Sequence, residues 1–176
     1  TDAVAPYSLY DNNIQIGTTT GNTLIAGHRT TYTANTNTTY GIYAINGDSV
    51  KFNNNIIRVN TGSNTTATHY GIFTSTGTNS NAELNGNNIS DTAIATTTSQ
   101  QAGIVNTFGT TGTNNTVNIQ NNTITNCLYS VPTSGTASYI QNSAGAFTIN
   151  ISGNTIQNNT YGAGTSTATG VITAIL

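Results

Sequence analysis

Few side chains in this sequence could act as acids, bases or metal ligands. The acidic residues are Asp2, Asp11, Asp48, Glu83 and Asp91, and no two of them align as a pair on adjacent repeats. A glycosidase needs two carboxyl groups on either side of the scissile bond, and calcium needs several oxygen ligands together. The sequence therefore predicts no catalytic residue, no metal site and no cofactor, and we expect a protein that is not an enzyme.

Two other places carry polar side chains of interest. Lys51 and Glu83 occupy the same position of neighbouring repeats, so we expect a cross-strand ion pair worth at most about 1 kcal/mol. His28 and Arg29 lie in a stretch of about 17–35 that interrupts the first repeat. An insertion in one repeat often carries a binding role. The alternative is a solvated loop with two incidental polar groups.

The composition favours strands and excludes several classes of partner. Charged residues make up 5% of the chain, against roughly 25% in an ordinary domain. The 176 residues include 38 Thr and 28 Asn, which favour strands and turns respectively. Three Lys and Arg residues are too few to bind phosphates, so we expect no nucleic-acid partner. No apolar run is long enough to span a membrane. The single cysteine, Cys127, should be a buried thiol.

A short asparagine motif recurs five times along the chain. Its copies are LYDNNI at 9–14, FNNNII at 52–57, LNGNNI at 84–89, IQNNTI at 119–124 and ISGNTI at 151–156. Successive copies are 43, 32, 35 and 32 residues apart. The residue before the repeated asparagine is always Asp, Asn or Gly, types that tolerate a left-handed backbone. The motif therefore predicts a sharp corner with the repeated asparagine just inside it.

Two further signals complete a unit of about 32–35 residues. An alternating stretch such as VKF at 50–52 precedes the asparagine motif, and a second apolar landmark follows the motif's isoleucine by 15 residues. In the last four units these landmarks are Ile72, Ile104, Tyr139 and Val171, and in the first unit the equivalent is Ile42, displaced by an insertion. All five units also carry a threonine six residues before the landmark, namely Thr36, Thr66, Thr98, Thr133 and Thr165. Each unit thus holds three short strands joined by turns, which is typical of a solenoid.

Stacking these units predicts columns of like residues. We expect the repeated asparagines to form a hydrogen-bonded ladder from coil to coil, with the threonines as an internal or an external hydroxyl row. The ladder asparagines are Asn12, Asn55, Asn87, Asn122 and Asn154. The expected core columns are Ile14, Ile57, Ile89, Ile124 and Ile156 in one, and Phe52, Leu84, Ile119 and Ile151 in another.

The four motifs FNNNII, LNGNNI, IQNNTI and ISGNTI, with the YGI and AGI landmarks, resemble right-handed parallel β-helix repeat proteins. The likeness covers the chain apart from roughly 17–35. It implies the fold but no single function, because that superfamily includes polysaccharide lyases and hydrolases, phage tailspikes and Thr/Asn-rich bacterial surface proteins.

We therefore predict one all-β domain over residues 1–176, a right-handed parallel β-helix (β-solenoid) of about five coils with three short strands each. Connections between parallel strands are right-handed in nearly all proteins. The only interruption is the insertion at about 17–35.

The two ends of the predicted stack read as strands without polar caps. The first is AVAPYSLY and the last is GVITAIL, and exposed strand edges pair with other chains. The candidate assembly residues are Val4, Tyr7 and Leu9 at one end and Val171, Ile172, Ile175 and Leu176 at the other. We expect an extracellular or cell-surface structural protein, whose partner is a further copy in a head-to-tail filament or the adjoining segment of a longer solenoid.

A different class of function also fits the sequence. The variable turns and the insertion with His28 and Arg29 could bind glycans, which would make the protein a carbohydrate-binding or adhesive surface module. Ice binding and polysaccharide lysis are weaker alternatives. Ice binding requires regular threonine ranks on a flat face, and only one threonine column is invariant here.

Overall fold

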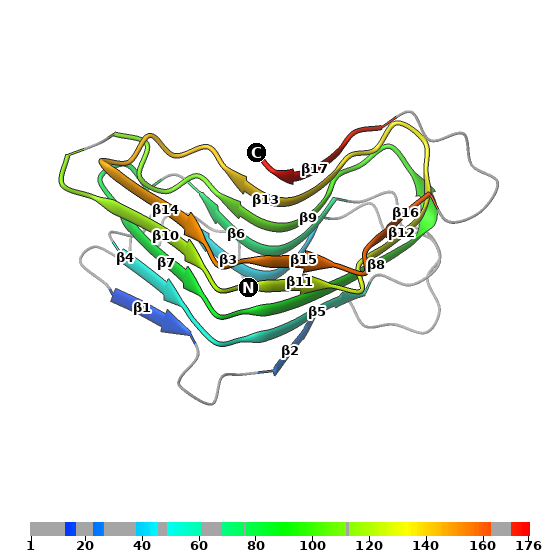
Figure 1. The fold of residues 1–176 in the computed structure, drawn as a ribbon, viewed down its shortest axis with the longest axis horizontal. Helices are drawn as coiled ribbons and strands as arrows, with labels where there is room; N and C mark the ends of the chain where they lie inside the picture. Colours follow the sequence, from blue (N-terminus) through cyan, green and yellow to red (C-terminus); the bar gives the residue numbers. More distant parts are fainter. Residues whose placement is uncertain are drawn as a thin grey trace, which may run out of the picture.

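The chain folds into three parallel β-sheets that wind around one core (Figure 1). The computed structural model describes residues 13–16, 23–26, 38–45, 49–60, 68–75, 77–111, 113–162 and 170–176. Within those ranges every secondary-structure element is a strand, and every strand pairing is parallel.

Each sheet takes one strand from each successive pass of the chain. Sheet 1 contains β1 (Asn13–Ile16), β4 (Ser49–Phe52), β7 (Asn81–Asn85), β10 (Thr116–Gln120) and β14 (Thr148–Ser152). Sheet 2 contains β2 (Thr23–Ala26), β5 (Ile56–Asn60), β8 (Asn88–Thr97), β11 (Thr123–Thr125) and β15 (Thr155–Gln157). It also contains β12 (Leu128–Pro132), which pairs with the second half of β8, and β16 (Thr160–Tyr161), which pairs with β12. Sheet 3 contains β3 (Thr39–Ile45), β6 (His69–Ser75), β9 (Gln101–Asn106), β13 (Ala137–Asn142) and β17 (Ile172–Ile175).

A chain that visits the same three sheets in turn, always in parallel, is a β-solenoid. The predicted all-β, parallel solenoid is therefore confirmed. The right-handed sense and the number of five coils stay predictions.

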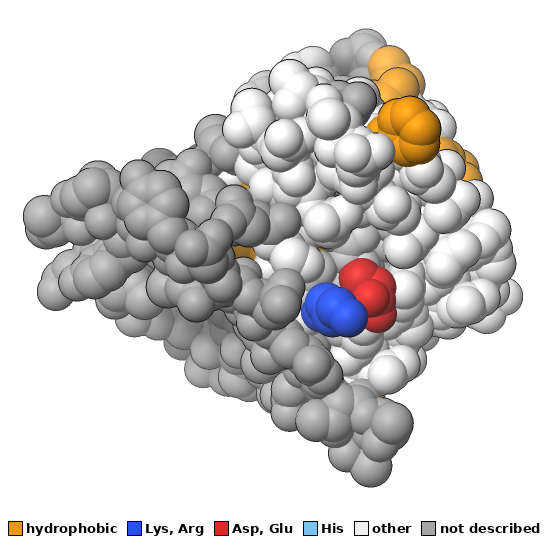
Figure 2. Space-filling view, turned by 90° about the vertical axis from the view of Figure 1, so that its left-hand side faces the viewer, with side chains coloured by type: hydrophobic (Ala, Val, Ile, Leu, Met, Phe, Trp, Pro, Cys, Tyr) orange, Lys and Arg blue, Asp and Glu red, His pale blue; other side chains and the backbone are white. Residues whose placement is uncertain are grey.

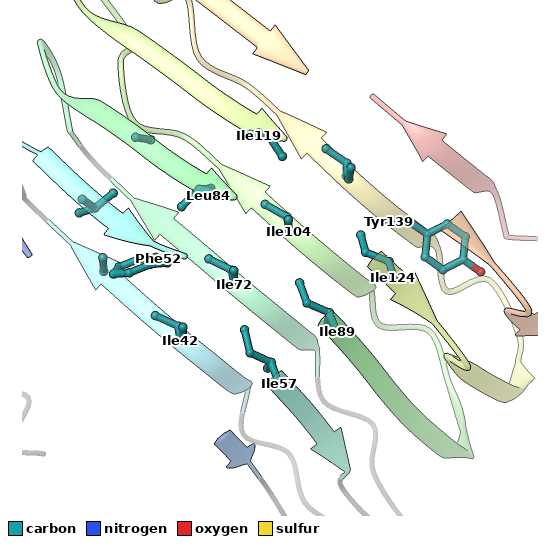
Figure 3. Close-up of a cluster of buried hydrophobic side chains, with 14 of the residues drawn as sticks. Ile42, Phe52, Ile57, Ile72, Leu84, Ile89, Ile104, Ile119, Ile124 and Tyr139 are labelled. Carbon is teal, nitrogen blue, oxygen red and sulfur yellow. The ribbon is translucent and has the colours of Figure 1, made fainter. Parts of the chain in front are cut away.

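The core is a set of columns in which one aliphatic side chain packs on its counterpart in the next coil (Figure 3). Ile57, Ile89 and Ile124 are in register on sheet 2 and fully buried. The columns of sheets 1 and 3 contain Phe52, Leu84 and Ile119, and Ile42, Ile72, Ile104 and Ile140. The columns end at Ile151 and Ile156, which are only partly buried.

The backbone passes very close to itself at one column of sheet 3. A Cβ atom on Gly71 would lie 2.5 Å from the carbonyl oxygen of Gly103 and 2.6 Å from Ile89 Cγ2. Gly41 and Gly103 are crowded in the same way by the isoleucines of sheet 2. The YGI and AGI sequences therefore need glycine at their middle position. A larger residue there would collide with the isoleucine column of sheet 2.

The predicted alignment of the first coil is wrong. Ile14 pairs with Val50 in sheet 1, not with Ile57 in sheet 2. The residue opposite Ile57 is Leu24 of β2, which lies inside the stretch interpreted as an insertion. The sequence GNTL at 21–24 resembles GNTI at 153–156, and its Leu24 lies ten residues after Ile14.

The predicted landmark of sheet 3 is also displaced in the later coils. Ile104 pairs with Ile140, and Ile140 pairs with Ile175, so Tyr139 and Val171 do not continue the isoleucine column. The corner after β11 contains an additional residue, Asn126, with φ of 56°. It shifts Leu128 and Tyr129 by one position relative to β8, but the register returns between Tyr129 and Val131. The displacement of Ile140 therefore arises between Pro132, which pairs with Thr97, and Ala137, which pairs with Gln101.

Candidate functional site

The repeated asparagines form a continuous ladder at the corner between sheets 1 and 2. The side-chain Nδ2 of Asn55 donates to Asn87 Oδ1 at 3.0 Å, Asn87 Nδ2 donates to Asn122 Oδ1 at 3.0 Å, and Asn122 Nδ2 donates to Asn154 Oδ1 at 2.9 Å. The structure thus brings these four asparagines together. Asn12, the fifth residue of the predicted ladder, lies outside the described residues.

The amides of Asn87, Asn122 and Asn154 also donate to backbone carbonyl oxygens. Asn87 Nδ2 donates to the carbonyl oxygen of Phe52, and Asn87 Oδ1 accepts the backbone N–H of Asn55 at 3.0 Å. The same pattern recurs at Asn122, which donates to Leu84. A buried amide must satisfy its donors and acceptors, and this arrangement satisfies both ends of the Asn87 side chain.

The residue before each ladder asparagine turns the chain. Asn54, Gly86, Asn121 and Gly153 have φ angles of 58°, 67°, 55° and 66°. Only glycine and asparagine adopt this left-handed backbone readily. Each corner therefore needs one residue that adopts the left-handed backbone and a following asparagine that makes the ladder hydrogen bonds.

The threonine column does not form a buried row in the described part of the chain. Thr98 and Thr133 are exposed. Thr36, Thr66 and Thr165 lie outside the described residues, as do Val4, Tyr7, Leu9, His28 and Arg29.

A buried ionisable pair, which the sequence analysis did not predict, lies near the corner between sheets 2 and 3. His69 Nδ1 lies 3.1 Å from Asp91 Oδ1, and each residue is 1% exposed. Asp91 Oδ2 has no hydrogen-bond partner among the described residues. Asp91 occupies a register position that Val59 fills in the preceding coil, so the pair replaces aliphatic packing in one coil only.

Cys127 belongs to the same buried region. Burial and the nearby Asp91 carboxylate raise the pKa of the Cys127 thiol to about 12. Burial and Cys127 likewise raise the pKa of the Tyr139 hydroxyl to about 12. His, Asp and Cys side chains thus approach one another here, but the thiol is protonated and inaccessible. Thiolates are the reactive form of cysteine, so this arrangement does not provide a nucleophile.

We expect Cys127 to resist alkylation in the folded protein. At about pH 8 the raised pKa keeps the thiol protonated, and the side chain is 3% exposed. Intact-mass analysis after iodoacetamide treatment should show no adduct in buffer and one adduct in concentrated guanidinium chloride. Rapid labelling of the folded protein would show that this region opens readily.

The outer surface of sheet 1 carries a single described ion pair. Lys51 Nζ lies 3.4 Å from Glu83 Oε2, both side chains being partly exposed, and this confirms their predicted alignment. Glu83 also accepts a hydrogen bond from Asn53 Nδ2. Figure 2 shows one basic and one acidic side chain side by side on this face, and the rest of its described surface is uncharged.

The last coil leaves an open face at one end of the solenoid. The strands β14, β15, β16 and β17 each lie at the edge of their row of strands, on the same end of the stack (Figure 1). The candidate end residues Val171, Ile172, Ile175 and Leu176 are 61%, 53%, 51% and 64% exposed. A hollow of about 420 Å³ opens here between Tyr139, Ile156, Tyr161 and Ile172.

The described ranges contain neither a candidate metal site nor a candidate membrane-spanning helix. No group of three or more His, Cys, Asp and Glu side chains there could hold a metal ion. Nor does that part of the chain contain a helix of the length and hydropathy needed to cross a membrane.

The fold and its ladder define the chain as a parallel β-solenoid with an internal asparagine ladder. Comparisons with models of protein families, with curated proteins and with solved structures find no match to this chain.

Proposed function

We propose that this protein is an extracellular structural β-solenoid that forms part of a filament or surface fibre by stacking on a further coil. The observation that carries the proposal is the open face of the coil that runs from β14 to β17. It combines unpaired strand edges with exposed aliphatic side chains in the described part of the chain.

Neighbouring coils within the chain already make the kind of contact that a further coil would make with this face. β10 pairs with β14 over five residues, and β13 pairs with β17. Asn122 Nδ2 donates a hydrogen bond to Asn154 Oδ1, just as Asn87 Nδ2 donates one to Asn122 Oδ1. A further coil with an asparagine at this corner would continue the ladder from Asn154 and bury the aliphatic residues at the end. Exposed strand edges and large apolar patches are typical of interaction surfaces.

The surface chemistry supports an extracellular location. Charged residues make up only 5% of the chain, and the outward positions of sheet 1 carry amides such as Asn118 and Asn150, which bond to each other at 2.8 Å. Such a surface, rich in amides and hydroxyls and poor in charge, is the kind that we expect of a rod exposed outside the cell. The partner in the proposed filament is a second copy of this chain or an adjoining solenoid segment.

We expect the variant Ile172→Lys to abolish assembly without unfolding the protein. Ile172 is 53% exposed on the open face, so lysine there leaves the core intact but places a charge where the next coil would pack. Electron microscopy and light scattering should show filaments for the unmodified protein and particles of 18.2 kDa for the variant.

The matched control is Asn118→Lys. Asn118 occupies the outward position of sheet 1 that Glu83 fills in the preceding coil and Lys51 in the one before, so a lysine there should leave assembly unchanged. Filaments formed by Ile172→Lys would exclude stacking through this face. An unmodified protein that stays at 18.2 kDa at high concentration would exclude the homopolymer.

A further inference from the structure

Four aromatic side chains gather on the outer surface of sheet 3. Tyr40 stacks on Tyr43 with ring centroids 4.6 Å apart, and on Tyr70 at 5.4 Å. Phe73 lies 4.7 Å from Tyr70 and 5.5 Å from Tyr43. Tyr43 is 47% exposed. The rings come from β3 and β6, so two neighbouring strands present one aromatic cluster to the outside.

A pair of glutamines continues this surface along the solenoid. Tyr70 Oη donates to Gln100 Oε1 at 3.4 Å, and Gln100 Nε2 donates to Gln141 Oε1 at 3.0 Å. Gln141 pairs with Val105, which in turn pairs with Phe73. The amides and the rings therefore lie on the same face of the sheet, on successive strands.

A hollow adjoins the glutamines on the side away from the rings. Its volume is about 400 Å³, and its walls include both glutamines, the hydroxyl residues Thr136, Ser138 and Thr173, and the apolar residues Val171 and Leu176. Rings, amides and hollow follow one another across the five strands of sheet 3, a distance of about 19 Å at about 4.8 Å between strands.

We propose that this face of sheet 3 binds a neutral polysaccharide lying along the solenoid axis. The C–H face of a sugar ring packs on aromatic rings, whose faces are electron-rich and apolar. Amides and hydroxyls both donate and accept hydrogen bonds, as sugar hydroxyls do. Apolar walls with a few convergent polar groups are typical of ligand sites.

The distribution of charge favours a neutral ligand over an acidic or basic one. The charged side chains of the described residues other than histidine are Lys51, Arg58, Glu83 and Asp91, and they belong to β4, β5, β7 and β8. None lies on sheet 3. Among the described residues, an acidic polysaccharide would find no Lys or Arg on this face to pair with its carboxylates. The rings and both glutamines lie on the side of the rod, away from the proposed stacking contact. Val171 and Leu176 of the hollow also belong to the open face, so stacking would cover that part of the site.

The test is affinity electrophoresis in gels that contain dissolved neutral polysaccharides (α- and β-glucans, mannans and xylans) or acidic polygalacturonate. The protein used is Ile172→Lys as well as the unmodified chain, so that failure to form filaments does not affect the result. At least one neutral polysaccharide should retard both proteins, and polygalacturonate should retard neither.

Two variants locate the site. Tyr43→Ala and Gln141→Ala should each raise the dissociation constant about tenfold, while the thermal midpoint stays unchanged. Phe147→Ala removes an aromatic ring that is 71% exposed outside this face, and it should bind like the unmodified chain. The proposal is overturned if no neutral polysaccharide causes retardation, if only polygalacturonate does, or if both variants bind as tightly as Phe147→Ala.

Discussion

The variant Asn87→Ala should lower the free energy of unfolding by about 3 kcal/mol. The Asn87 amide donates to Phe52 O and Asn122 Oδ1, and its oxygen accepts bonds from both the backbone N–H and the Nδ2 of Asn55. Asn87 is 1% exposed, so water cannot replace these bonds. Alanine leaves several buried polar groups without a partner, in two adjacent coils at once.

For a domain of this size, that loss of stability should lower the thermal unfolding midpoint of Asn87→Ala by about 6–12 °C relative to the unmodified protein. The control is Asn150→Ala, which removes a single exposed bond to Asn118 and should change stability by less than about 0.5 kcal/mol. If the two asparagine variants unfold at the same temperature, the ladder does not stabilise the solenoid.

The variant His69→Leu should be destabilised by about 3–5 kcal/mol, the usual cost of removing one member of a buried pair. It leaves the Asp91 carboxylate buried, since Asp91 is 1% exposed and its other oxygen has no partner in the described ranges. Chemical denaturation followed by far-ultraviolet circular dichroism measures this loss.

The double variant His69→Leu/Asp91→Val separates a charge effect from a packing effect. Val59 occupies the position of Asp91 in the preceding coil, so valine already fits this part of the wall. We expect the double variant to recover most of the stability lost in His69→Leu. If the double variant is no more stable than His69→Leu, the loss in the single variant does not come from an unpaired buried carboxylate.

The asparagine motif predicted the strand register in the middle of the solenoid, because the motif includes both residues that form the corner. In FNNNII, LNGNNI, IQNNTI and ISGNTI one residue sets the backbone turn and the next supplies the ladder amide, so local sequence determines the register of the strands on both sides. The β5–β8 and β8–β11 pairings follow from this motif alone.

The first coil could not be placed in this way. LYDNNI fits the motif better than GNTL, because GNTL lacks the final isoleucine and the apolar residue upstream. Only the pairing of β2 with β5, which is a contact between segments more than thirty residues apart, identifies the correct copy. Long-range pairing thus overrides a good local match.

The buried pair was missed for a related reason. His69 and Asp91 are separated by 22 residues and meet across two coils, and no spacing rule links them. One signal was present in the sequence: Asp91 stands two residues after Ile89, where the alternation of a strand points the side chain inward. A carboxylate at an inward position requires a buried partner.

The orientation of the hydrogen bonds has a mechanical consequence. The strand pairings and the asparagine ladder join one coil to the next, so these bonds run along the solenoid axis. Tension applied along that axis would load the bonds of the outermost coil first and peel the rod open one coil at a time. Tension applied across the axis would load many strands in shear together. The rod formed by one chain would therefore resist sideways force better than axial pulling, and it would lengthen by releasing coils instead of breaking at once.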